Sequence, residues 1–365
     1  MIVYGSEYSY FTGKFEAYLR YKEIPYERRP LGFYNYLWRI PRKVGVAQLP
    51  TVELPGGRWM TDTTPMIGWL EQQHPTPPVL VPDPLQRFFG LLIEDFADEW
   101  LWRSAMHYRW DYAPDRALMR RQLASELLRV PLPLAIRARW IGLRQRRIFV
   151  TGDGVDRRTR PHVDAAYTRA LDRLEPVLAE RPFLFGERPT IADFGLMGPM
   201  FRHFAIDPTP ARIMRDRAPA VYEWVARVWG ARASRLGGGE LLDGLPQDLG
   251  PLLRESGETH LEMLAANAAA HGRGESRYDL RVQGVTYERI PTSSYRVWAL
   301  EQLRHHFRRL PIAERERAEE LLRSHGCWVA LWRVEQLDSG HDPDRRAPFG
   351  KGSRMVRDGG LLMRR

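Results

Sequence analysis

The sequence predicts an α/β domain followed by an all-α domain, and then a smaller α+β extension. Residues 1–80 alternate between short apolar runs and helical periodicity. Residues 86–232 keep helical periodicity throughout and offer no credible pair of strands. After three consecutive glycines, the pattern changes again and includes a hairpin signal. We therefore expect domains at 1–76, 86–233 and 240–338, followed by a mobile tail at 339–365.

The first domain is predicted to be a strand–helix–strand unit followed by two strands and a helix. The apolar run at 1–5 predicts a buried strand, and Phe15, Tyr18 and Leu19 at i, i+3 and i+4 predict one buried helix face. The remaining elements are a second strand that starts with residues 24–27, strands at 49–54 and 58–60, a helix at 63–73, and a proline-rich linker at 75–84.

The extension is predicted to combine three helices with one hairpin. Gln283-Gly284 has the composition of a two-residue hairpin turn. The expected strands are 278–282 and 285–289, and the expected helices are 258–271, 294–309 and 312–325.

Composition excludes several classes of protein. The 365 residues contain 44% hydrophobic residues, which excludes a disordered chain. The single cysteine, Cys327, excludes an intramolecular disulfide framework and fits a reducing compartment. The sequence has no signal-peptide pattern at its start and no apolar run long enough to span a membrane. We therefore expect a cytoplasmic protein with no membrane segment.

The formal net charge of +10 raises the question of nucleic acid binding. The excess is local, because residues 136–160 and 341–365 together supply it. Neither zinc-finger spacing nor an aromatic-glycine RNA motif is present. A nucleic acid partner would need basic residues over one continuous face, so solvated basic faces are the favoured interpretation and no nucleic acid partner is expected.

Four motifs, in the right order and at the right spacing, resemble those of the glutathione transferase family. The resemblance covers about residues 1–232. It implies a thioredoxin-like domain, a helical domain, glutathione as co-substrate, and a homodimer. The motifs are Ser9-Tyr10-Phe11-Thr12-Gly13-Lys14 with Ile24-Pro25-Tyr26-Glu27, Leu49-Pro50-Thr51-Val52, Asp62-Thr63 with Trp69-Leu70-Glu71, and Phe183-Leu184-Phe185-Gly186 with Pro189-Thr190-Ile191-Ala192-Asp193.

The resemblance implies which residues bind glutathione. Pro50 is expected in cis, so that the backbone of Leu49, with Gln48 beside it, pairs with the cysteinyl unit like an added strand. Asp62-Thr63 lies between a strand and a helix, and a helix N-terminus there would bind the γ-glutamyl carboxylate. An ordinary edge proline and a plain N-cap are the structural alternatives.

Ser9 stands where the family places its catalytic serine or cysteine, five residues before Lys14. A donated hydrogen bond and the N-terminus of the first helix would stabilise the glutathione thiolate. Tyr8 and Tyr10 flank Ser9, and either phenol is an alternative donor. A serine that merely caps the helix is the third interpretation.

The electrophile pocket is expected in the tryptophan-rich stretch 94–110, although aromatic residues at helical spacing are more often core. Its candidate residues are Trp100, Arg103, His107 and Trp110. The acidic residues of the same stretch lack the spacing of a di-iron site, and no metal is expected. Thr190 and Asp193 form a capping box, which is assigned to stability.

The predicted function is attack of the glutathione thiolate on a small hydrophobic electrophile. The alternative is a non-catalytic binding or scaffold protein on the same fold, because residues 14–20 and 24–27 also resemble the metaxin and failed-axon-connections relatives. A cleft filled by the extension would favour this alternative.

Overall fold

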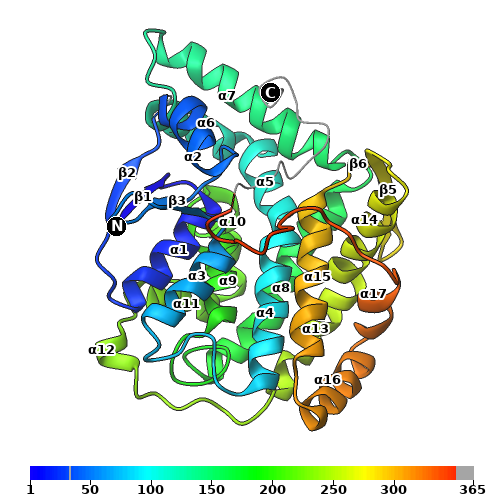
Figure 1. Ribbon diagram of the computed structural model, residues 1–365. Coiled ribbons are helices and arrows are strands. Elements are labelled where there is room, and N and C mark those ends of the chain that lie inside the picture. Colours follow the sequence, from blue (N-terminus) through cyan, green and yellow to red (C-terminus); the bar gives the residue numbers. More distant parts are fainter. Residues whose placement is uncertain (33, 351–365) are drawn as a thin grey trace.

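The computed structural model describes residues 1–32 and 34–350, and it arranges them as a small mixed sheet beside a large helical assembly (Figure 1). The sheet has the order β2-β1-β3-β4, with β1 parallel to β2 and antiparallel to β3. The elements of this N-terminal part are β1 (Ile2–Gly5), α1 (Tyr10–Tyr21), β2 (Glu27–Pro30), η1 (Asn35–Arg39), α2 (Ile40–Val44), β3 (Thr51–Glu53), β4 (Trp59–Thr61) and α3 (Thr63–Gln73).

Most of these elements lie where the sequence predicts them, with two differences. Strand β2 starts at Glu27 rather than at residue 24, because Pro25 has no N–H to donate to β1. The segment before Leu49, for which no element was predicted, contains η1 and α2, and α2 ends at Gly45 in the left-handed region (φ 82°).

The second part is helical, as predicted. Helix α4 packs against α9, and α1 of the first part packs against α9 as well. A capping box at Thr190 and Asp193 starts α9, as the sequence predicts. The elements are α4 (Pro84–Glu99), α5 (Leu101–Asp111), α6 (Ala113–Leu127), α7 (Leu134–Phe149), η2 (Thr151–Asp153), α8 (Arg160–Glu180), α9 (Ile191–Pro199), η3 (Met200–Phe204), α10 (Pro208–Arg217), α11 (Pro219–Gly230) and α12 (Ala233–Leu236).

The extension contains the predicted helices and hairpin, and its strands meet at a Gln283-Gly284 turn with φ values of 47° and 79°. Its first helical run starts at residue 250 instead of 258. The glycine inside this run permits close approach, since a Cβ on Gly257 would lie 3.0 Å from the carbonyl oxygen of Gly326. The elements are η4 (Gln247–Leu249), α13 (Gly250–Glu255), η5 (Ser256–Leu261), α14 (Glu262–Gly272), β5 (Arg277–Val282), β6 (Val285–Pro291), α15 (Ser294–Arg308), α16 (Ile312–Ser324) and α17 (Trp328–Trp332).

One hydrophobic core runs through all three parts, from Val3 in β1 to Leu331 in α17. Helices α15 and α16 pack along α4, so the extension covers one side of the helical domain (Figure 1). The ring of Phe307 on α15 packs between α4 and α17. Its centre lies 5.7 Å from that of Phe88 on α4 and 5.4 Å from that of Trp328 on α17. The extension therefore folds onto the molecule and shares its core.

The segment that follows α17 returns across α15 to the N-terminal part (Figure 1). Glu301 of α15 accepts hydrogen bonds from the amide and the hydroxyl of Ser339, at 2.8 and 2.7 Å. The carbonyl oxygen of Pro348 accepts one from Thr61 N at the end of β4 (3.1 Å), and Phe349 packs edge-on against Trp69. Residues 339–350 are therefore packed against the fold, which corrects the expectation of a mobile tail from 339. Residues 351–365 lie outside the described residues.

We predict that Phe307→Ala lowers the free energy of unfolding by about 3–5 kcal/mol, the usual range for removing a buried aromatic ring. Val329→Ala is the control in the same extension, because Val329 is 67% exposed and its loss should change stability by less than about 0.5 kcal/mol. Chemical denaturation of the full chain measures both. If Phe307→Ala behaved like the control, or split the unfolding into two transitions, the shared core would be refuted.

Candidate functional site

Three loops leave the sheet at the same end. In the antiparallel register, Tyr4 at the end of β1 pairs with Thr51 at the start of β3, and Thr51 pairs with Thr61 at the end of β4. The loop 6–9, the segment 48–50 and the turn 62–63 are therefore neighbours. These are the segments that carry the predicted glutathione-binding residues.

Ser9 is the N-cap of α1, and its hydroxyl oxygen accepts a hydrogen bond from Thr12 N at 3.3 Å. The side chain remains partly exposed, and its O–H is still available to donate. The capping role and the proposed catalytic role are therefore compatible.

Buried arginines from the helical domain hold the loop that precedes Ser9. Arg109 donates from Nη1 to the carbonyl oxygen of Tyr8 (2.6 Å), and Arg202 donates to that of Glu7. Arg109 is itself paired with Asp207, at 2.8 and 3.0 Å. No pattern in the sequence indicates either arginine, because they lie about 100 and 200 residues after the loop that they fix.

The two tyrosines beside Ser9 differ in their surroundings. Tyr10 is buried, and its hydroxyl donates a hydrogen bond to the carbonyl oxygen of Ala97. Burial raises the pKa of Tyr10 well above its ordinary value. This phenol is already used inside the domain interface, which argues against Tyr10 as a thiol activator. Tyr8 is only half-buried, and burial raises its pKa as well.

The Leu49–Pro50 peptide bond is cis, as the family resemblance implies. The side chain of Leu49 packs against a small apolar cluster that contains Tyr4 and Trp59. The carbonyl oxygen of Gln48 accepts a hydrogen bond from the Thr51 hydroxyl at 2.8 Å. These contacts fix the segment at the end of the sheet.

The Asp62–Thr63 turn is in contact with the extension. Asp62 has a φ of 73°, in the left-handed region, and α3 starts directly after it. The hydroxyl of Tyr295 on α15 donates to Asp62 Oδ1 at 3.2 Å. Burial raises the pKa of Asp62 to about 7, although the nearby Lys14 lowers it. No pattern in the sequence relates Tyr295 to this turn.

A buried ion-pair cluster lies beside this turn. Lys14 of α1, fully buried, pairs with Glu94 and Asp98 of α4, and its Nζ also lies 3.3 Å from the hydroxyl oxygen of Thr64. Burial alone would lower the pKa of Lys14, but Asp98 and Glu94 raise it above its ordinary value. The sequence holds one indication of this cluster: Glu94 and Asp98 stand at i and i+4 on one helix, and the chain has few lysines that could pair with them.

The predicted electrophile pocket is not a cleft. Trp100, Arg103, His107 and Trp110 are each at most 3% exposed. Arg103 Nε donates to Asp153 at 2.9 Å, and its guanidinium lies 4.5 Å from the ring centre of Tyr287 in the hairpin. His107 lies between Asp111 and Asp164, at 3.0 and 3.1 Å, and these hydrogen bonds outweigh burial and raise its pKa. These four residues belong to the core. The hairpin ring of Tyr287 packs against Trp100 and Arg103, whereas His107 and Trp110 lie on α5, which packs against α8 and other helices of the helical domain.

Half-buried aromatic rings lie closer to Ser9. Phe11 follows Ser9 by two residues and stacks on Trp102 at 5.8 Å between ring centres. Trp102 meets Phe149 of α7 edge-on at 5.6 Å. These three side chains are partly exposed, so they offer an apolar wall beside Ser9 that no sequence pattern indicates.

Within residues 1–32 and 34–350, no group of three or more His, Cys, Asp or Glu side chains is arranged to hold a metal ion. None of the helices in this same part of the chain is long and apolar enough to cross a membrane.

Two family models match the chain. Residues 3–78 match the glutathione S-transferase N-terminal domain, and residues 146–230 match the C-terminal domain. The chain belongs to the glutathione S-transferase family. Within this family member, both matched regions lie before residue 231, and the extension follows them.

Solved structures of glutathione S-transferases are similar to this family member at low identity. One from Rhodospirillum rubrum is 18% identical, covers 67% of this chain and 95% of its own, and has a TM-score of 0.43. One from Methylobacterium radiotolerans, in complex with glutathione sulfonate, is 20% identical and has a TM-score of 0.38; the match covers 65% of this chain and 91% of that chain. The β-etherase LigF from Sphingobium is 16% identical and has a TM-score of 0.45; the match covers 62% of this chain and 93% of that chain. No curated protein matches the chain.

We predict that Asp62→Asn stabilises the protein above pH 7 by up to about 4 kcal/mol. Because the folded-state pKa of Asp62 is raised to about 7, the wild type loses stability as pH rises from about 4 to about 7, and the neutral amide avoids this loss. Urea unfolding between pH 4 and 8 measures the difference, with exposed Asp243→Asn as the control. A difference that did not grow with pH would contradict the raised pKa.

Proposed function

We propose that the protein binds glutathione where the three loops meet at the end of the sheet. The observation that carries this proposal is the convergence of Ser9, the cis Leu49–Pro50 segment and the Asp62–Thr63 turn at one end of the sheet. The backbone of Leu49 would pair with the cysteinyl unit, with Gln48 beside it, and the first turn of α3 would receive the γ-glutamyl carboxylate.

Ser9 would then stabilise the glutathione thiolate. Its hydroxyl oxygen accepts from Thr12 N, so the O–H can point outward to a sulfur anion at the N-terminus of α1. The thiolate sulfur would form a bond to an electrophilic carbon, and the leaving group would depart with the bonding electron pair. No general base is needed once the thiol is ionised.

The acceptor is proposed to be a small hydrophobic electrophile. The half-buried wall of Phe11, Trp102 and Phe149 supports this class, because it places apolar surface next to Ser9. This wall replaces the four buried residues that the sequence suggested.

A second candidate function is binding without catalysis. One observation favours it, because Tyr295 of the extension donates a hydrogen bond to Asp62 at the proposed glutathione site. If this contact excludes glutathione, Tyr295→Phe should bind glutathione more tightly than wild type does. If neither the wild type nor Tyr295→Phe binds glutathione, the scaffold function is favoured.

We predict that Thr63→Ala weakens glutathione binding by about 1.5–3 kcal/mol, the usual loss for a hydrogen bond to a charged group. Isothermal titration calorimetry with the full chain measures the affinity. Thr168→Ala on α8 is the matched control, since its hydroxyl bonds locally to the carbonyl oxygen of Ala165. Equal affinity in Thr63→Ala and its control would remove Thr63 from the site.

We further predict that Ser9→Ala raises the pKa of bound glutathione toward the solution value of a free thiol, about 8.5, and lowers the rate about 10²–10³-fold. The ultraviolet absorbance of the bound thiolate against pH gives the pKa. Ser125→Ala on α6 is the control, and Tyr8→Phe tests the remaining phenol. A shifted titration in Tyr8→Phe but not in Ser9→Ala would transfer the role to Tyr8.

The homodimer, which the family resemblance implies, and the cytoplasmic location, which the sequence composition favours, stay predictions. Light scattering of the purified full chain tests the first.

A further inference from the structure

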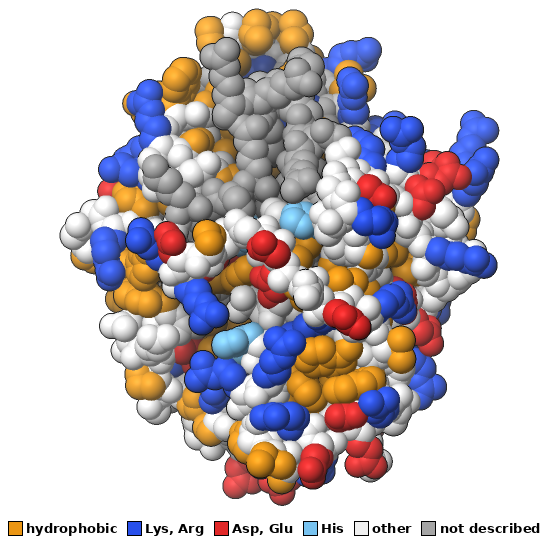
Figure 2. All heavy atoms as spheres, turned by 45° about the vertical axis from the view of Figure 1, so that its right-hand side comes forward, with side chains coloured by type: hydrophobic (Ala, Val, Ile, Leu, Met, Phe, Trp, Pro, Cys, Tyr) orange, Lys and Arg blue, Asp and Glu red, His pale blue; other side chains and the backbone are white. Residues whose placement is uncertain are grey.

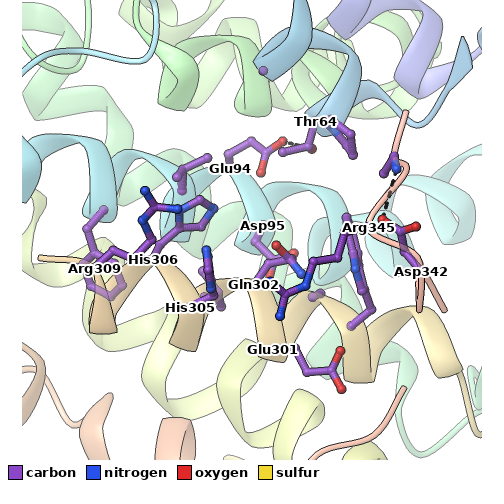
Figure 3. A pocket seen from close by; sticks show the side chains of 18 of the residues that line it. Thr64, Glu94, Asp95, Glu301, Gln302, His305, His306, Arg309, Asp342 and Arg345 are labelled. Carbon is purple, nitrogen blue, oxygen red and sulfur yellow. Dashed lines mark hydrogen bonds between the residues drawn. The ribbon is translucent and has the colours of Figure 1, made fainter. Parts of the chain in front are cut away.

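A cavity of about 1210 Å³ lies between the N-terminal part, the helical domain and the extension (Figure 3). It is bounded by α3, α4, α15 and the returning segment 338–347. Thr64 and Pro65 of α3 line it, whereas Ser9, Leu49 and Thr63 do not. The cavity is therefore separate from the proposed thiol site, and it exists only because the extension folds back.

One part of the cavity wall is apolar. Phe88 and Leu91 come from α4, and Leu303 and Leu310 come from α15 and the turn after it. Trp298 adds an aromatic face from α15. This wall can take the body of an organic molecule.

Basic side chains converge on another part of the wall from three separate elements. His305, His306 and Arg309 come from the end of α15, Arg87 comes from α4, and Arg345 comes from the returning segment. Figure 3 shows His305, His306 and Arg309 together, with Arg345 extending over α15 toward them. On the face that includes the extension, Figure 2 shows Lys and Arg side chains beside a histidine.

The carboxylates of the cavity are held by other groups. Glu94 pairs with Lys14, Asp95 with His260, and Glu301 with Ser339. Asp342 accepts from the backbone N–H groups of Arg346 and Ala347, and Asp338 accepts from that of Gly340.

The guanidinium groups have no such partner. Within residues 1–32 and 34–350, no carboxylate pairs with Arg87, Arg309 or Arg345; Arg87 donates to the carbonyl oxygens of Val81 and Leu80 instead. The pKa of both histidines is lowered, first by burial and then by positive neighbours, and that of His306 falls to about 4. The positive charge at this end of the cavity therefore comes from the arginines, and the two histidines are neutral near pH 7 and can each donate one N–H.

Helix polarity explains only part of this cluster. Basic residues are favourable in the last turn of a helix, which accounts for His305, His306 and Arg309 on α15. It does not account for Arg87 or Arg345, which reach the same place from other elements. Their convergence without carboxylate partners is what a site for an anion requires.

We propose that this cavity binds an organic phosphate, with the phosphate among Arg87, Arg309, Arg345 and the two histidines and the organic body against the apolar wall. Donors that approach from several directions match the terminal oxygens of a phosphate better than a planar carboxylate, which one guanidinium satisfies. Inorganic phosphate alone would leave most of the volume and the apolar wall unused. This site goes beyond the proposed function and does not depend on it.

Calorimetry with adenosine 5′-monophosphate, inorganic phosphate and adenosine tests the proposal on the full chain. We expect the nucleotide to bind more tightly than either of its parts, and to bind more weakly as salt increases. Arg309→Gln with Arg345→Gln should weaken nucleotide binding about tenfold for each guanidinium removed. Both side chains are exposed, so the double variant should fold, which far-ultraviolet circular dichroism checks.

The matched control is Arg121→Gln with Arg317→Gln, which removes the same charge from exposed positions on α6 and α16 outside the cavity. It should leave nucleotide binding unchanged, and so should Ser9→Ala. The proposal is overturned if the nucleotide does not bind at millimolar concentration, if adenosine or inorganic phosphate binds equally well, or if the double variant matches its control.

Discussion

The buried pairing of Lys14 with Glu94 and Asp98 holds the N-terminal part against the helical domain. Burying charges is costly, and removing one partner leaves the other uncompensated, so the three groups must stay together. The pairing fixes α1 against α4, and through Thr64 it also reaches the start of α3. The helix that Ser9 caps and the turn at Asp62 are thereby positioned by one cluster of charges.

Helix α4 also connects this cluster to the extension. It presents Glu94 and Asp98 to Lys14, and it presents Phe88 to Phe307 of α15. Through α15, Tyr295 reaches Asp62, and the returning segment reaches Thr61. The extension therefore borders the proposed glutathione site and builds the basic cavity beside it. A ligand in the proposed glutathione site and a ligand in the basic cavity would contact neighbouring parts of α3 and α15.

Local sequence signals predicted the elements and the three segments of the candidate site. Asp62-Thr63 before an apolar helix, Leu49-Pro50 before a strand, and Ser9 before the first helix are each short-range patterns. The four residues predicted to line the electrophile pocket are buried in the core instead. Periodicity predicts which face of a helix is apolar but not what covers that face. For the same reason the sequence could not show that the Tyr10 hydroxyl already has an acceptor, since that acceptor lies 87 residues away, on another helix.

The sequence by itself determined the order of the predicted strands and helices, the capping box at Thr190 and Asp193, and the hairpin turn at Gln283-Gly284, whereas the cis Leu49–Pro50 bond was expected from the family resemblance. These features depend on residues close together in the chain, whose backbone preferences are largely local. Only the tertiary structure decided that Tyr295 meets Asp62, that residues 339–350 return to β4, and that basic residues from three elements share one cavity. Such contacts join residues hundreds of positions apart, and they form because the apolar faces of α4 and α15 must be buried together.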